Sequence, residues 1–225
     1  MSTVGTLFVK PEDLGWIRVS APISSFTVPF AREFAESYPF PPPATVYGIL
    51  LSYIGEVNRR RFMGAEIAIA LIGQTLPSVV IRKMRRVKKP DLNDPSNSKP
   101  DFQTLLTGLK FLVGVRRRTS GQTGLWEKVN DAYLHPDTVY RFGGLSCGES
   151  HNLIDEFSVL DWDDARKLMA RDEVMLLSPS ERGEWSVPVW VDHVGSEGTV
   201  WARASLMPAR SIAEHVGVFA INDRH

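Results

Sequence analysis

The order of the predicted elements indicates an α+β fold with a βαββαβ core, an inserted basic β-hairpin arm and a small β-rich C-terminal lobe. Three observations lead to this prediction. Strand-like and helix-like hydrophobic patterns alternate in that order between about residues 16 and 162. A dense run of cations at 82–89 interrupts the core pattern. Two further strand-like segments, each containing tryptophan, follow at 185–191 and 199–204.

The first strand is indicated by a two-residue hydrophobic period. Ile17, Val19 and Ala21 alternate with Arg18 and Ser20. Because successive side chains of a strand point to opposite faces, this alternation predicts a strand with one buried face.

A proline-rich run at 38–48, Tyr-Pro-Phe-Pro-Pro-Pro-Ala-Thr-Val-Tyr-Gly, precedes the first helix. Prolines fix φ near about −65° and favour extended backbone before them, and Pro43 suits the first position of a helix. The positions of one apolar helix face then follow, namely Val46, Ile49, Leu50, Tyr53 and Ile54. Gly55 is expected to end this helix. The run therefore predicts an extended strut that sets the entry angle of a short helix.

The second and third strands flank the predicted arm. Residues 65–72 are apolar on both faces, which predicts a central strand. The chain then turns basic, with six cations in the eight positions 82–89. A strand with cations on both faces cannot lie flat on a core, so we expect an arm at about residues 78–110 that projects from the body. Its tip would be the polar, proline-flanked segment 90–100, and 109–118 would return to the body as a strand.

The rest of the core completes the predicted order. Helical spacing at 121–134 is followed by a glycine-rich loop at 140–150 and a strand at 154–162. This βαββαβ order is that of ferredoxin-like and RNA-recognition (RRM-like) sheets, whose open face can receive single-stranded bases. We divide the chain into a first domain, 1–162, and a small β-rich lobe, 163–225.

Length, cysteine content and hydrophobicity limit the classes of protein to which the chain can belong. The chain has 225 residues, 43% of them apolar, which suffices for one well-buried core. Cys147 is its single cysteine, so an internal disulfide and a cysteine-based metal cluster are excluded. The sequence lacks an apolar run long enough for a membrane span and a basic-then-apolar N-terminal signal. We therefore expect a cytoplasmic protein with no cofactor and no membrane partner.

The net charge of zero conceals two halves of opposite sign. Residues 1–118 contain 17 basic and 9 acidic residues, a formal charge of +8. Residues 119–225 contain 9 basic and 17 acidic residues, a formal charge of −8. Such an asymmetry suggests a polyanion site on one side of the molecule and a protein-contacting or solvated surface on the other.

The candidate RNA-binding residues lie near the proline run, in the arm and in the glycine-rich loop. Arginine can bind phosphate through two hydrogen bonds or stack on bases, lysine acts as a point charge, and glycine lets backbone N–H groups approach a phosphate closely. The candidates are Arg32, Tyr47, Arg82, Lys83, Arg85, Arg86, Lys88, Arg141, Gly143, Gly144, Ser146 and His151. If about five phosphates of a single strand are neutralised, the log–log salt slope of binding would be roughly −3.5.

Catalysis is not required by any spacing in the sequence. The five histidines lack metal-ligand spacing with one another or with Cys147. Lys128, Tyr133, His135 and His151 could supply a set for metal-free RNA cleavage, but nothing in their spacing demands it. We therefore expect a protein that is not an enzyme and assign no catalytic residue. Two alternatives stay open: a metal-independent endoribonuclease and a generic single-stranded RNA-binding module.

Three of these features together resemble the Cas "five" family of CRISPR-associated RAMP proteins. The first is the strand running into Phe26 and Pro29, followed by the Ser-Tyr-Pro-Phe-Pro-Pro-Pro-Ala-Thr segment at 37–45 and by Tyr-Gly at 47–48. The second is the basic arm, which is similar to the family's thumb. The third is the glycine-rich loop before a strand. The resemblance covers about residues 10–162.

The resemblance implies a non-catalytic subunit of a type I Cascade surveillance complex in antiviral defence. Such a subunit binds the guide RNA (crRNA) and caps its 5′ handle. Its partners would be the guide RNA, the backbone subunits and the large subunit, with target DNA reached indirectly through the complex. In one subtype the family member cleaves the precursor RNA with a Tyr/Lys/His set, which we could not place residue by residue in this sequence.

Overall fold

The computed structural model describes residues 7–29, 31, 34–85, 88–118, 124–171, 173–194, 197–209 and 214–223, with 83–85 described as backbone only. Its helices are α1 (Pro43–Tyr53), α2 (Leu125–Leu134) and α3 (Trp162–Met169). Its strands are β1 (Leu7–Val9), β2 (Leu14–Ser24), β3 (Phe34–Ala35), β4 (Glu66–Ile72), β5 (Leu76–Arg85), β6 (Ser98–Arg116), β7 (Glu156–Leu160), β8 (Val174–Pro179), β9 (Trp185–Trp190), β10 (Val200–Pro208) and β11 (Val216–Ala220). Within the described residues, no helix is long and apolar enough to cross a membrane.

One mostly antiparallel sheet dominates this mixed α and β structure, as the sequence predicted in outline. The main path of the sheet runs β7-β2-β6-β4-β8-β10-β9. The short strand β3 pairs with β6 in parallel, and the other pairings are antiparallel. The predicted central strand 65–72 corresponds to β4, which pairs with β6 along its length and with β8 and β11. Both faces of β4 are apolar because both are covered.

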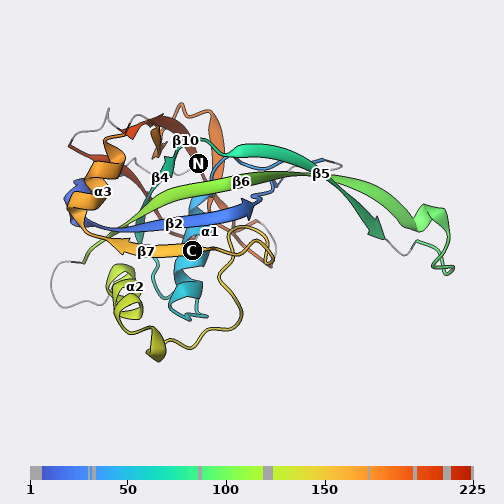
Figure 1. Cartoon of the computed structure of the whole chain (residues 1–225), viewed down its shortest axis with the longest axis horizontal. Helices are drawn as coiled ribbons and strands as arrows, with labels where there is room; N and C mark the ends of the chain where they lie inside the picture. The colour runs from blue at the N-terminus through green and yellow to red at the C-terminus, as the bar shows by residue number, and fades with distance from the viewer. Residues whose placement is uncertain are drawn as a thin grey trace.

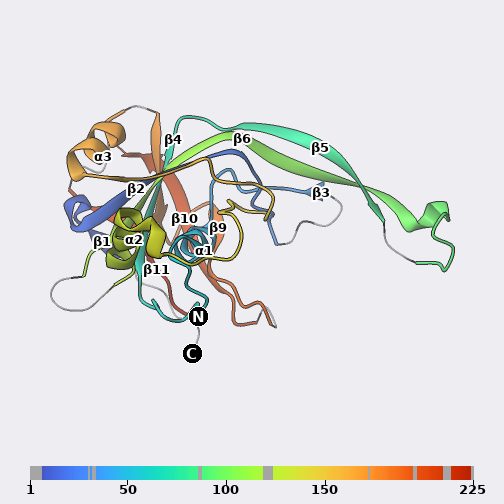
Figure 2. The same ribbon diagram turned by 60° about the horizontal axis from the view of Figure 1, so that its bottom comes forward.

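The long strand β6 connects the body to a projecting hairpin. Its C-terminal half pairs with β2 from Leu14↔Arg116 to Ser24↔Leu106. Its N-terminal half continues beyond the body and pairs with β5, from Leu76↔Thr107 to Arg85↔Ser98. At about 3.4 Å per residue, such a strand spans roughly 60 Å. Figures 1 and 2 show this hairpin extending well away from the rest of the chain.

The proline strut starts α1 as its sequence predicted. Pro42 is the N-cap, with φ −63° and ψ 152°, and Pro43 is the first helical residue. The helix ends at Tyr53, and Gly55 then takes a φ of +69°, a left-handed value that favours glycine. The strut is itself buried: Tyr38 donates a 2.6 Å hydrogen bond to the Ser186 carbonyl oxygen at β9.

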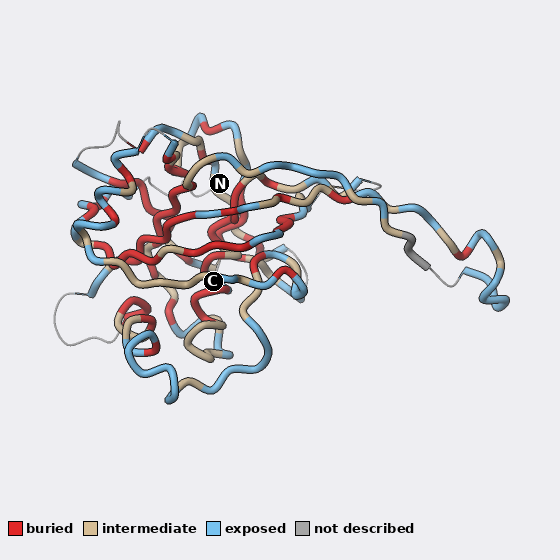
Figure 3. Tube along the Cα trace, viewed as in Figure 1, coloured by how far each residue is buried: buried red, intermediate tan, exposed pale blue. Residues whose placement is uncertain are grey.

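Two hydrophobic clusters lie on opposite faces of the sheet. The larger one contains side chains of α1 and α2, together with Phe111 and Val113 of β6. The smaller one contains Ala165 and Met169 of α3 together with Ala68 and Leu112. The small side chains Ala68 and Ala70 of β4 thus belong to the same cluster as the buried face of α3. Figure 3 shows buried backbone concentrated in the body and mostly exposed backbone along the hairpin.

The C-terminal residues are rich in strands, and these continue the sheet of the first half. Strand β8 pairs with β4 from Ile69↔Leu177 to Ile72↔Val174. The proline strut also packs on β9, where the rings of Phe40 and Trp185 lie 5.4 Å apart. Residue 162 is therefore not a break in the sheet.

Candidate RNA interface

The cations of the hairpin occupy different environments. Arg82 is half-buried at the base of the hairpin and pairs with Asp101 at 3.1 Å and with Glu149 at 3.5 Å. Lys88 and Lys89 are exposed near the tip, and the Lys89 ammonium pairs with Asp94 at 3.1 Å. The cation at the base is thus held by two carboxylates, while both tip lysines are exposed and Lys89 is paired with one carboxylate.

The tip is organised by Asn97, which is buried although it lies at the end of an exposed arm. Its side-chain oxygen accepts hydrogen bonds from the backbone N–H groups of Lys88 and Lys89, at 2.7 and 3.0 Å. Its amide nitrogen donates to the carbonyl oxygens of Lys89 and Asp91, at 3.1 and 2.7 Å. The backbone that carries the two lysines is therefore fixed by one side chain.

The glycine-rich loop folds back on itself in its second half. Cys147 N–H donates to the Asn152 carbonyl oxygen at 2.8 Å, and Ile154 N–H donates to the Leu145 carbonyl oxygen at 3.0 Å. Gly148 has a φ of +95°, and a Cβ atom there would lie 2.1 Å from the Ser25 carbonyl oxygen. This position requires glycine for both its conformation and the close approach of two backbones.

Glu149 connects the loop to the base of the hairpin. Its carboxylate pairs with Arg82 of β5 at 3.5 Å and with the His151 imidazole at 3.4 Å. It also accepts a 2.5 Å hydrogen bond from the amide of Gln103 on β6. Two regions that the sequence singled out separately, the basic arm and the glycine-rich loop, are thereby brought into one surface. The sequence did not identify Glu149 or Gln103, because only the fold places them beside Arg82.

Other candidates in the loop are accessible. Arg141, Gly143 and Gly144 are exposed, and a Cβ atom on Gly143 would meet no atom within 4 Å. His151 is also exposed. Ser146 is half-buried and forms an isolated bridge with Leu153.

Tyr47, one of the predicted RNA-binding residues, is buried in the structure. Its side chain is only 2% exposed, and its hydroxyl donates a 2.7 Å hydrogen bond to the Arg59 carbonyl oxygen. Burial raises the pKa of Tyr47 to about 12. Tyr47 and Ser146 line the same 290 Å³ pocket between α1 and the loop. The Tyr47 side chain nevertheless belongs to the buried hydrophobic core and not to an exposed surface. The Tyr38 hydroxyl likewise holds the proline strut in place through its hydrogen bond to the Ser186 carbonyl oxygen.

Four candidates are only partly described or not described. Arg32 and Arg86 lie outside the described residues. Lys83 and Arg85 are described by their backbone in β5, opposite Pro100 and Ser98. Their contributions to binding stay predictions.

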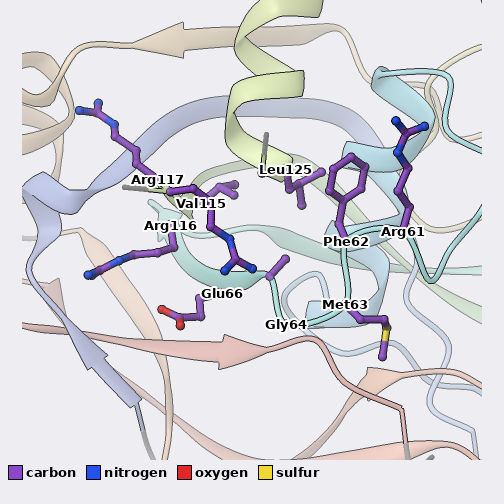
Figure 4. Close-up of a pocket in the computed structure, with 12 residues that line it drawn as sticks. Arg61, Phe62, Met63, Gly64, Glu66, Val115, Arg116, Arg117 and Leu125 are labelled. Carbon is purple, nitrogen blue, oxygen red and sulfur yellow. The ribbon is translucent and has the colours of Figure 1, made fainter. Parts of the chain in front are cut away.

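A second group of arginines lies at the other end of β6, around a pocket of 540 Å³ (Figure 4). The pocket is lined by Arg61, Arg116, Arg117 and Arg118 among others. The Arg61 guanidinium pairs with Glu56 at 2.7 Å, and that of Arg116 pairs with Asp13 at 3.2 Å. The Arg117 guanidinium lies over Trp126, 5.6 Å from the ring centroid. Because these groups point apart, we do not include the pocket in the candidate interface.

The residues considered for RNA cleavage do not share a common partner in the described structure. His135 pairs with Asp131 of α2 at 3.2 Å, whereas His151 pairs with Glu149 of the loop. Among the residues that are described, no group of three or more His, Cys, Asp or Glu side chains is placed to hold a metal ion.

Cys147 belongs to the glycine-rich loop, and its side chain is buried, so its reactivity measures whether the loop stays folded. Burial raises the pKa of the thiol to about 12. Because the thiolate is the reactive form, we expect alkylation by iodoacetamide at pH about 8 to be roughly 1,000-fold slower than that of an exposed cysteine. Mass spectrometry of the intact chain would measure the rate, with the urea-unfolded chain as the control. Native labelling as fast as that of the unfolded chain would contradict a closed loop.

Comparison with known proteins identifies the family. A family model described as CRISPR-associated protein (Cas_Cas5) matches residues 16–194. A curated protein named CRISPR-associated protein Cas5, from Myxococcus xanthus (strain DK1622), is 34% identical over 187 residues, which are 81% of this chain and 85% of that protein. The fold is similar to a chain of a solved "CRISPR RNA-guided surveillance complex", with a TM-score of 0.63, 15% identity and 91% of each chain covered. It is also similar to a solved "CRISPR-associated Protein", with a TM-score of 0.52, 10% identity and coverage of 96% and 95%.

These matches extend over most of the chain, including the hairpin and the glycine-rich loop. The fold is that of CRISPR-associated proteins of the same general size. The chain belongs to the CRISPR-associated Cas5 family. The resemblance inferred from the proline run, the arm and the loop is confirmed.

Proposed function

We propose that this chain is a non-catalytic subunit of a type I Cascade surveillance complex, in which it binds the guide RNA and caps its 5′ handle. The observation that carries the proposal is the surface formed by the hairpin and the glycine-rich loop around Glu149. It combines exposed cations with exposed backbone, which suits a single-stranded polyanion. Family membership supports the CRISPR setting, and the similarity in fold to a chain of an RNA-guided surveillance complex supports an RNA-guided assembly.

The same proposal gives the fold a more specific interpretation. The order β2, α1, β4, β6, α2 and β7 corresponds to a ferredoxin-like βαββαβ core, with the β5–β6 hairpin as its thumb. The strand order β7-β2-β6-β4 and its antiparallel pairings support this interpretation. Backbone and large subunits of the complex would be the protein partners, and target DNA would be reached through the guide.

A binding titration in EDTA tests the proposal. The full chain is mixed with fluorescently labelled single-stranded RNA carrying the CRISPR repeat sequence, at salt concentrations between about 50 and 200 mM. If about five phosphates are contacted, the log–log slope should be roughly −3.5, and affinity should fall about 100-fold over this range. The RNA should remain intact on a denaturing gel.

Two outcomes would contradict the proposal in different ways. Specific cleavage of the RNA in EDTA, abolished by His151→Ala, would indicate a metal-independent endoribonuclease. Equal affinity for repeat RNA and for unrelated single strands, together with failure to co-purify any other subunit, would indicate a generic RNA-binding module.

A further inference from the structure

The first half of the glycine-rich loop presents two aromatic rings to solvent. Tyr140 is 87% exposed and Phe142 is 98% exposed, and the exposed Arg141 lies between them. Single exposed apolar residues are common on protein surfaces. Two large rings in alternate positions, almost free of contacts, indicate a surface that is covered by something else when the protein works.

The backbone that carries these rings is anchored to the end of α1. The Tyr140 carbonyl oxygen packs against Gly55, where a Cβ atom would lie 2.1 Å from it. Tyr53, at the end of α1, stacks on Phe157 with a centroid distance of 3.8 Å. Burial raises the pKa of Tyr53, and the nearby positive charge of Arg141 partly offsets this increase. The rings therefore project from a backbone that is held on a rigid base.

The rings are of a kind that stacks on nucleic-acid bases. Residues 139–141 have no assigned helix or strand, and Phe142 lies in a bend. Tyr140 and Phe142 are therefore two exposed rings on an irregular segment, with the exposed Arg141 between them. Every base has a π-face on which such a ring can stack. Base–aromatic stacking of this kind is tolerant of sequence.

Charge favours RNA over a protein as the occupant. Between 139 and 148, Arg141 is the only charged residue in the sequence, so this segment of the loop offers a cation and no carboxylate. The loop then leads to Glu149 and His151, and through Glu149 to Arg82 at the base of the hairpin. Tyr140 and Phe142 precede Glu149 in the sequence, and no acidic residue lies between them and Glu149.

We propose that Tyr140 and Phe142 form a base-stacking site, with Arg141 binding the phosphate beside the stacked base. This inference rests on the proposed function, since it extends the same RNA surface. In this proposal, stacking on Tyr140 and Phe142 strengthens RNA binding and fixes the position of one base. The hairpin supplies the longer-range electrostatic attraction.

The test uses the full chain and a short single-stranded RNA in which one 2-aminopurine is moved along the sequence. Fluorescence anisotropy measures affinity, and quenching of the 2-aminopurine reports stacking. Changing Tyr140→Ala and Phe142→Ala together should raise Kd roughly 10- to 100-fold and remove the quenching at one position. The aromatic pair Tyr140→Phe and Phe142→Tyr should retain both. Val57→Ala, at another highly exposed apolar position, is the matched control and should bind as the wild type does.

The outcomes separate this inference from the proposed function. If the double alanine variant binds RNA with unchanged affinity and unchanged quenching, the stacking site is wrong while RNA binding stands. If that variant binds RNA normally but no longer co-purifies with another subunit, the rings form a protein contact, and the stacking site is again wrong. If the wild-type chain binds no RNA, the proposed function fails and the stacking site fails with it.

Discussion

Replacing Lys88 and Lys89 with glutamate is expected to weaken RNA binding by roughly 100-fold at about 0.1 M salt. Both lysines are exposed near the hairpin tip. Each lost phosphate contact removes about 0.7 from the salt slope and about fivefold in affinity at this salt concentration, and the reversed charges add repulsion. The slope should therefore become shallower by about 1.4. Fluorescence anisotropy at several salt concentrations measures both quantities.

The fold of the tip should survive this change. Asn97 binds the backbone N–H groups of Lys88 and Lys89 rather than their side chains. Among the described residues, the side-chain contact that is lost is the exposed pair between Lys89 and Asp94, and such pairs contribute little to stability. The melting temperature should thus change little.

A charge-matched control comes from α3, which lies at the opposite end of the molecule from the hairpin (Figure 1). Arg166→Glu and Lys167→Glu produce the same change in net charge at exposed positions. If the hairpin is the binding element, this control should lose far less affinity than the tip variant. Equal losses in both variants would mean that the net charge of the chain, and not the hairpin, determines affinity.

The second large effect is expected at Gly148, where alanine should lower the free energy of unfolding by about 3 kcal/mol. The φ of +95° disfavours any residue with a Cβ atom by roughly 1–2 kcal/mol. The new atom would also lie 2.1 Å from the Ser25 carbonyl oxygen, and such overpacking typically costs about 1–3 kcal/mol. In a domain of this size, the melting temperature should fall by roughly 6–12 °C.

Gly143 provides a control that separates the two contributions. It also has a left-handed φ, of +81°, but a Cβ atom there would meet nothing within 4 Å. Gly143→Ala should therefore show the conformational cost alone, about 1 kcal/mol. Urea unfolding monitored by tryptophan fluorescence would measure both variants. Equal destabilisation by the two changes would show that the contact with Ser25 does not hold the loop in place.

The sequence determined the order and type of the core elements because each depends on local patterns. The two-residue period from Ile17 to Ala21 lies within β2, and Pro43 begins α1 as predicted. The basic run with cations on both faces predicted a projecting hairpin, and β5 and β6 form one. The proline run, the basic arm and the glycine-rich loop together indicated the family that the comparison then showed. All of these signals come from neighbouring residues, whose spacing decides helix, strand or break without reference to the rest of the chain.

The site depended on contacts between residues far apart in the sequence, which only the tertiary structure decided. Tyr47 was a plausible RNA contact from its position in the proline run, but the packing of α1 buries it. Glu149 gave no signal by itself, and it became the connection between loop and hairpin because the sheet places it beside Arg82. The burial of a side chain and its charge partners depend on the packing of whole elements, and local hydrophobic spacing carries no information about that packing.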